Sequence, residues 1–105
     1  MKVINSNEFD ATIKDGTILV DFYADWCMPC RQLAPVLEEL SEQYTGKVDF
    51  VKVDIEESRD IAERFGIMSI PTVIIFKNGE VAKQMAGFQP KQMFAQNIDE
   101  VLLKI

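Results

Sequence analysis

The two cysteines of the chain lie in the run Trp26-Cys27-Met28-Pro29-Cys30, where a strand-like segment gives way to a helix-like one. Two thiols separated by two residues at the start of a helix lie on one face, about one turn apart, so their sulfurs can join with little backbone movement. The unpaired N–H groups and the positive dipole of a helix N-terminus favour a thiolate at the first cysteine. We therefore expect Cys27 to be a nucleophile and Cys30, deeper and more buried, to be its resolving partner.

Three other roles for the cysteine pair need to be compared with this one. A structural zinc site needs four ligands, and the chain offers two cysteines and no histidine, so we expect no metal. A structural disulfide that closes a loop of two residues constrains the unfolded chain very little. Two unrelated buried thiols remain possible, although Trp26 before the pair and Pro29 inside it argue against coincidence. The pattern favours a reversible redox pair.

Composition limits the size and the partners of the protein. The chain has 105 residues, of which 48% are apolar, and this is enough for one core and a single domain over residues 1–105. A net charge of −6 disfavours nucleic acid and anionic membranes, so we expect protein partners. We also expect the protein to be a monomer. Residues 1–6 lack the apolar core of a secretory signal, and no apolar run could span a membrane. We expect a soluble, cytoplasmic protein, and in a reducing compartment such cysteines are more often catalytic than structural.

Apolar periodicity and turn residues predict strands and helices in the order βαβαβαββα. The run 18–24 alternates little and therefore reads as a central strand that is buried on both faces, joined through a helix to a parallel neighbour. Asn78-Gly79 predicts an antiparallel hairpin, so the sheet should be mixed. Asn5 and Glu8 have the spacing of a capping box, and Pro35 should bend its helix without ending it. The predicted strands are 2–4, 18–24, 48–54, 72–77 and 80–86, and the predicted helices are 5–14, 27–44, 58–65 and 90–105.

Several motifs together resemble the thioredoxin family over essentially the whole chain. They are the Trp-Cys-x-Pro-Cys run, Val20-Asp21-Phe22, Lys52, Ile70-Pro71-Thr72, Lys77-Asn78-Gly79 and Gly87. The resemblance implies an α/β thioredoxin fold, with a central mixed sheet of about five strands flanked by about four helices. It also implies a protein-disulfide reductase without a bound cofactor. Its partners would be disulfide-containing protein substrates and a thioredoxin reductase, with nicotinamide or ferredoxin as the ultimate electron source.

Asp21 is a carboxylate inside an apolar run, so it either faces solvent or is buried with a raised pKa. Apolar neighbours on both sides favour burial. Because the chain has no histidine, a desolvated carboxylate is the remaining candidate for a base near neutral pH. The resemblance implies that Asp21 takes the proton of the resolving cysteine, through water, and that Lys52 tunes Asp21. From the residues alone, Lys52 could equally be a surface lysine.

Pro71 would carry a trans peptide bond if judged from the sequence alone, since cis is the rare form. The resemblance reverses this expectation, because the family keeps a cis proline here that faces the disulfide and aligns an extended substrate segment. Around the first sulfur we expect a flat apolar collar that binds diverse protein substrates. Each apolar member could instead belong to the core. The collar would consist of Trp26, Met28, Ile55, Ile70, Gly87 and Phe88.

The chain departs from the family pattern at two positions. Met28 stands where the family usually has glycine, and Tyr23 stands where it often has a second tryptophan. Met28 and Pro29, between the sulfurs, are expected to tune the redox pair, since a methionine side chain can shield Cys27 without adding charge. The histidine that oxidising relatives place between their cysteines is absent, which favours a reductant.

Two other functions remain open at this point. The fold could serve as a binding module in which the cysteines are incidental, and binding would then survive replacement of both cysteines by serine. Alternatively, the protein could be an isomerase or an oxidase of an oxidising compartment, which its redox potential against glutathione would reveal.

Overall fold

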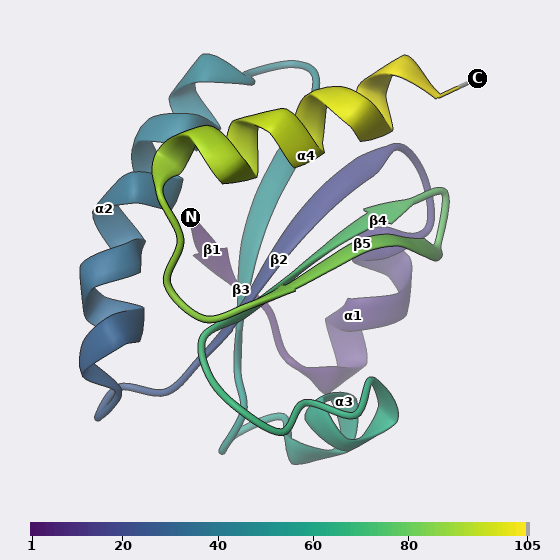
Figure 1. Ribbon diagram of the computed structural model, residues 1–105. Coiled ribbons are helices and arrows are strands. Elements are labelled where there is room, and N and C mark those ends of the chain that lie inside the picture. The colour runs from purple at the N-terminus through teal and green to yellow at the C-terminus, as the bar shows by residue number, and fades with distance from the viewer. Residues whose placement is uncertain (105) are drawn as a thin grey trace.

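The computed structural model describes residues 1–104, and its helices and strands follow the predicted order (Figure 1). Most boundaries lie within one or two residues of the predicted ones. Ile105, which the sequence assigns to the last helix, lies outside the described residues. The elements are β1 (Lys2–Val3), α1 (Ser6–Ile13), β2 (Thr17–Tyr23), α2 (Met28–Gln43), β3 (Asp49–Asp54), α3 (Arg59–Arg64), β4 (Thr72–Lys77), β5 (Glu80–Ala86) and α4 (Lys91–Leu103).

The five strands form one sheet in the order β1-β3-β2-β4-β5. β3 pairs in parallel with both β1 and β2, whereas β4 pairs antiparallel with β2 and with β5. Asn78 and Gly79 form the turn between β4 and β5, with φ values of 51° and 87°, as a two-residue hairpin turn requires. The sheet is therefore mixed, as predicted, and β2 is its central strand.

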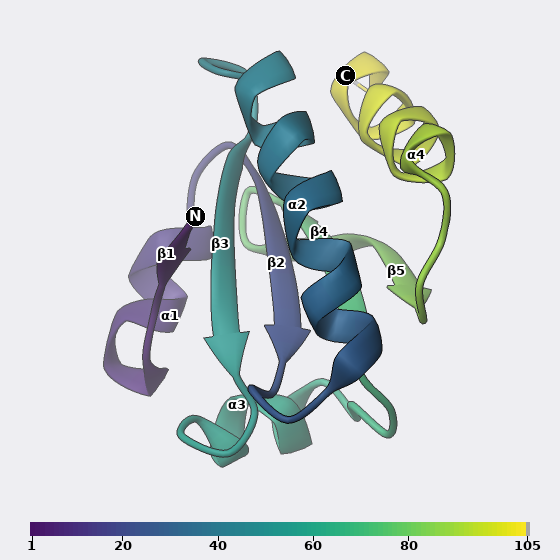
Figure 2. The ribbon, with the colours of Figure 1, turned by 90° about the vertical axis from the view of Figure 1, so that its left-hand side faces the viewer.

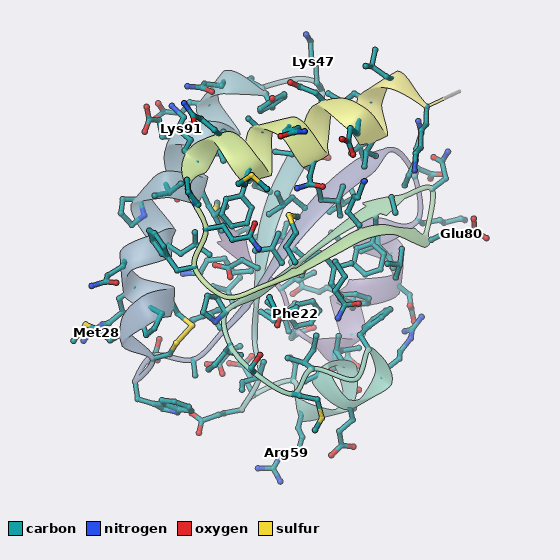
Figure 3. The ribbon with its side chains drawn as sticks, viewed as in Figure 1. Phe22, Met28, Lys47, Arg59, Glu80 and Lys91 are labelled. Carbon is teal, nitrogen blue, oxygen red and sulfur yellow. A yellow bond between two sulfur atoms is a disulfide. The ribbon has the colours of Figure 1, made fainter. Side chains whose placement is uncertain are left out.

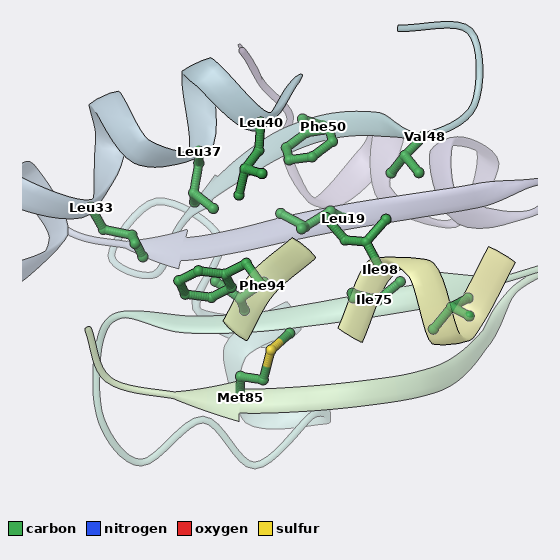
Figure 4. Close-up of a cluster of buried hydrophobic side chains, with 12 residues drawn as sticks. Leu19, Leu33, Leu37, Leu40, Val48, Phe50, Ile75, Met85, Phe94 and Ile98 are labelled. Atoms are coloured by element: carbon green, nitrogen blue, oxygen red, sulfur yellow. The ribbon is translucent and has the colours of Figure 1, made fainter. Parts of the chain in front are cut away.

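Helices cover both faces of the sheet. Figures 1 and 2 show α2 and α4 on one face and α1 and α3 on the other. Side chains of a strand point alternately to the two faces, so Leu19 packs under α2 and α4, while Val20 packs toward α1 and α3. Figure 4 shows the first of these two clusters, in which Phe94 and Ile98 of α4 lie over Leu19 and Ile75. The second cluster centres on Phe9, Phe22, Phe65 and Phe76.

Local signals account for the helix ends. The Asn5 side chain accepts the N–H of Glu8 and the Glu8 side chain accepts the N–H of Asn5, both at 3.0 Å, so the predicted capping box is present. α2 continues through Pro35, as expected. Pro90, predicted inside the first turn of the last helix, is instead its N-cap, because its ψ of 149° is extended. None of the helices in residues 1–104 is long and apolar enough to cross a membrane.

Phe94 gives a direct test of the packing of α4 on the sheet. Its side chain is fully buried, so Phe94→Ala should lower the free energy of unfolding by about 3–5 kcal/mol. The neighbouring Met93 is 45% exposed, and Met93→Ala should change the free energy of unfolding by less than about 0.5 kcal/mol. Urea denaturation at equilibrium measures both values. Equal effects of the two substitutions would contradict this placement of α4.

Candidate active site

The two cysteines lie where the chain leaves the central strand β2 and enters α2. Cys27 is the N-cap residue of α2, with extended backbone angles, and Cys30 is the third residue of the helix. Their sulfurs form a disulfide, and their Cα atoms are 5.3 Å apart, within the range usual for disulfides. Figure 3 shows this disulfide at the N-terminal end of α2, near the labelled Met28. The helix start therefore supplies the geometry that the spacing predicts.

The backbone of the first turn of α2 points a donor at the outer sulfur. The N–H of Cys30 donates to Cys27 Sγ at 3.2 Å, which is the contact that a serine or asparagine side chain makes at an N-cap. Pro29 has no N–H, so Cys30 supplies this donor. Such a donor and the dipole of α2 both stabilise negative charge on Cys27 when the disulfide opens.

The expectation that Cys30 is more buried than Cys27 is wrong for the disulfide form, since each residue is only 4% exposed. The reason is that residues from distant segments of the chain pack against both cysteines. The two cysteines and Ala24 form one small cluster, and Ile55 and Ile70 pack against it from other parts of the chain. The two sulfurs are therefore distinguished by their positions at the helix N-terminus rather than by exposure.

Asp21 lies in the middle of β2 and is only 1% exposed, so the predicted burial is confirmed. Within residues 1–104 no group donates a hydrogen bond to its Oδ1. Burial raises the pKa of Asp21 to about 6, and the positive charge of Lys52, its register partner on β3, offsets part of that effect. Lys52 is half-buried, and its Nζ lies 4.1 Å from the centroid of the Tyr23 ring.

An open hollow of about 300 Å³ lies beside Cys30. It brings together two predicted site residues, Cys30 and Lys52, with others that the motifs did not single out. Tyr23 stood out in the sequence only as a departure from the family pattern. The lining residues are Tyr23, Ala24, Asp25, Cys30, Arg31, Ala34 and Lys52.

A second hollow of about 310 Å³ lies on the Trp26 side of the cysteines. Three predicted members of the apolar collar line it, namely Trp26, Ile55 and Ile70. Three further residues of its lining were missed, and these are Ile67, Met68 and Ser69. Their signal in the sequence was an apolar Ile-Met pair one residue before the Ile-Pro motif. Met68 is 95% exposed, which is unusual for so apolar a side chain.

The other predicted residues of the collar are not among those that line this hollow. The Ile70–Pro71 peptide bond is cis, as the resemblance implies, and the Ile70 carbonyl oxygen lies 3.8 Å from Cys27 Sγ. The N–H of Gly87 donates to the Pro71 carbonyl at 2.8 Å, so Gly87 lies beside the proline. Met28 and Phe88 are both exposed and lie outside the lining of the hollow.

A sulfur pair that opens and closes at a helix N-terminus exchanges two electrons with other disulfides, which is the chemistry of a thiol–disulfide oxidoreductase. Comparison with known proteins agrees with this class. The family model described as thioredoxin matches residues 1–100. Thioredoxins of Staphylococcus haemolyticus and Staphylococcus saprophyticus are 50% and 49% identical, each over 97% of both chains. The thioredoxin of Staphylococcus epidermidis is 46% identical over 94% of this chain and 95% of its own length.

The chain therefore belongs to the thioredoxin family, and its five-stranded mixed sheet with four helices in residues 1–104 has the thioredoxin fold. It is a protein-disulfide oxidoreductase that works by dithiol–disulfide exchange, for which the Cys27–Cys30 pair is in place.

The raised pKa of Asp21 makes the stability of the fold depend on pH. The unfolded carboxyl ionises near pH 3.8 and the folded one near pH 6, so the folded state holds its proton more tightly. Stability from this group is fully present below about pH 4 and is lost as the pH rises through about 6. The difference of roughly two pKa units corresponds to about 3 kcal/mol.

Asp21→Asn removes this titration, so the variant should be more stable than the parent chain by about 3 kcal/mol at pH 8, with the gain vanishing near pH 4. Denaturant unfolding at a series of pH values measures the difference. The control is Asp25→Asn, an exposed carboxylate beside the site, which should alter stability by less than about 0.5 kcal/mol. A gain for Asp21→Asn that is the same at both pH values would refute the assignment.

Proposed function

We propose that this single domain reduces disulfide bonds of other proteins, with Cys27 as the nucleophile, Cys30 as the resolving thiol and Asp21 as the base. The observation that carries this assignment is the N–H of Cys30 directed at Cys27 Sγ at 3.2 Å. This donor stabilises charge on Cys27, and within residues 1–104 no corresponding hydrogen bond reaches Cys30 Sγ. In the dithiol form, Cys27 is therefore the sulfur that ionises first.

In the first step the Cys27 thiolate attacks one sulfur of a substrate disulfide in line. A mixed disulfide forms between Cys27 and that sulfur, and the other substrate sulfur leaves as a thiolate. The hollow lined by Trp26, Ile55 and Ile70 supports the view that an apolar segment of the substrate is held beside Cys27. Phe88, Gly87 and Met28 extend this surface as exposed or adjacent residues.

In the second step Cys30 loses its proton and its thiolate attacks Cys27 Sγ. The mixed disulfide breaks, the second substrate thiolate leaves, and the protein carries the Cys27–Cys30 disulfide, so two electrons have passed to the substrate. Asp21 has the raised pKa that a base near neutral pH needs. It shares a face of the sheet with Tyr23 and Lys52, which line the hollow beside Cys30, and this supports its role.

The oxidised protein must regain two electrons before another turnover. We propose a thioredoxin reductase as the donor, because members of this family exchange electrons with a reductase and with disulfide-containing substrates. A reductant of this kind fits a reducing compartment, and we propose the cytoplasm. We also propose that the chain acts as a monomer and that Met28 and Pro29 tune its potential. Met28 does so by covering Cys27 with an uncharged side chain.

Replacing each cysteine by serine tests the two roles. Cys27→Ser should abolish the reduction of insulin disulfides, because no nucleophile remains. Cys30→Ser should also stop turnover but should accumulate a mixed disulfide between Cys27 and the substrate, visible as a reductant-sensitive adduct on gels and by mass spectrometry. Measurable turnover by Cys27→Ser, or a mixed disulfide that accumulates on Cys27→Ser and not on Cys30→Ser, would contradict the assignment.

The same variants separate this function from that of a binding module. If the fold only binds a partner, both serine variants should keep its biological activity. The parent chain treated with a thiol-alkylating reagent after reduction serves as a chemical control, since it should behave as Cys27→Ser does.

A further inference from the structure

Several carboxylates surround Tyr23, yet the ammonium group of Lys52 lies against the Tyr23 ring itself. Its Nζ is 4.1 Å from the centroid of the Tyr23 ring, within the range of a cation–π contact. None of the ion pairs among residues 1–104 involves Lys52. Lysine side chains are long and flexible, so a contact with a ring face restricts where the ammonium group lies.

The register of the sheet explains why these three side chains meet. Asp21 and Lys52 lie opposite each other on the paired strands β2 and β3. Tyr23 follows Asp21 by two residues, so both side chains leave β2 on the same face, the one covered by α2. Tyr23 is the last residue of the strand and lines the hollow beside Cys30 together with Lys52. The Tyr23 ring and the Lys52 ammonium group therefore lie together beside Cys30, on the face of the sheet that also carries Asp21.

We propose that Tyr23 is a positioning residue, whose ring face holds the Lys52 ammonium group where its charge acts on Asp21. This inference rests on the proposed function only in that Asp21 is taken as the base for Cys30. The chain thus uses an aromatic residue, which carries no charge, to place a cation beside a carboxylate that accepts no hydrogen bond at Oδ1 from residues 1–104.

The charges around Tyr23 agree with this role. Burial, followed by nearby carboxylates, raises the pKa of Tyr23, so its phenol stays neutral at physiological pH and holds Lys52 through the ring face. A lysine without this contact could turn toward the other carboxylates and leave Asp21. The ionisable groups around Asp21 and this ring are Lys52 and Asp54 of β3, Asp25 and Glu57 of the flanking loops, and Cys30 and Arg31 of α2.

The test follows the titration of Asp21 in the full chain by NMR of its side-chain carboxyl carbon. Tyr23→Leu removes the ring and should raise the titration midpoint by on the order of half a pH unit, since an opposite charge nearby lowers a carboxyl pKa. Tyr23→Phe keeps the ring and should leave the midpoint near that of the parent chain. Lys52→Met should raise the midpoint at least as far as Tyr23→Leu does.

The decisive variant combines two changes. If Tyr23 acts through Lys52, then Tyr23→Leu in the Lys52→Met background should shift the midpoint no further. A shift of the same size in that background would overturn the proposal, because Tyr23 would then act on Asp21 directly, through burial. An unchanged midpoint in Tyr23→Leu alone would also overturn it. Tyr23→Ile, whose β-branched side chain suits a strand, repeats the series if Tyr23→Leu does not fold.

A second readout reports on the contact itself. In the parent chain and in Tyr23→Phe, the Hε protons of Lys52 should be shifted upfield by the aromatic ring, and in Tyr23→Leu they should resonate as in an exposed lysine. The rate at which Cys30 resolves a mixed disulfide is measured on the same variants. The same rate is measured on Asp21→Asn. If Asp21→Asn leaves the rate unchanged while the titration series behaves as described, the proposed role of Asp21 fails and the positioning by Tyr23 stands.

Discussion

The hydrogen bond from the Cys30 N–H to Cys27 Sγ is the contact on which the rest of the site depends. It exists because α2 begins at Met28 and leaves Cys27 as its N-cap, directly after the central strand. The strands on both sides of β2 fix where that strand ends, and the Ile70–Pro71 turn lies against the same sulfur. The sheet thus holds one sulfur at the positive end of a helix, where a charge that forms during disulfide exchange is stabilised.

In contrast to Cys27, the Asp21 carboxylate in β2 has surroundings that disfavour its charged form. Asp21 is buried without a hydrogen bond to Oδ1 from residues 1–104, so its charged form destabilises the fold at neutral pH. The apolar clusters on both faces of the sheet outweigh this cost. Lys52, held against Tyr23, offsets only part of the rise that burial causes in the pKa of Asp21. The resulting pKa of about 6 is close enough to neutral pH for a base both to accept and to release a proton.

Local patterns predicted much of this structure, and contacts between distant segments account for what they did not predict. Asn78-Gly79 set the hairpin, and the apolar neighbours of Asp21 indicated its burial. The strand order and the antiparallel pairing of β2 with β4 join segments far apart in the chain, so no local pattern encodes them. Ile67 and Met68 were missed because they lie in an irregular loop, which has no periodicity to show which way its side chains face.

The ionisation of Cys27 in the reduced protein tests the central claim most directly. The ultraviolet absorbance of the thiolate, followed against pH in the parent chain and in Cys27→Ser, isolates the signal of this sulfur. The helix start and the Cys30 N–H predict that Cys27 is half ionised well below the value of about pH 8.5 at which an ordinary cysteine is. Half ionisation at or above that pH would contradict the account, because the N-cap position would then confer no preference for the thiolate.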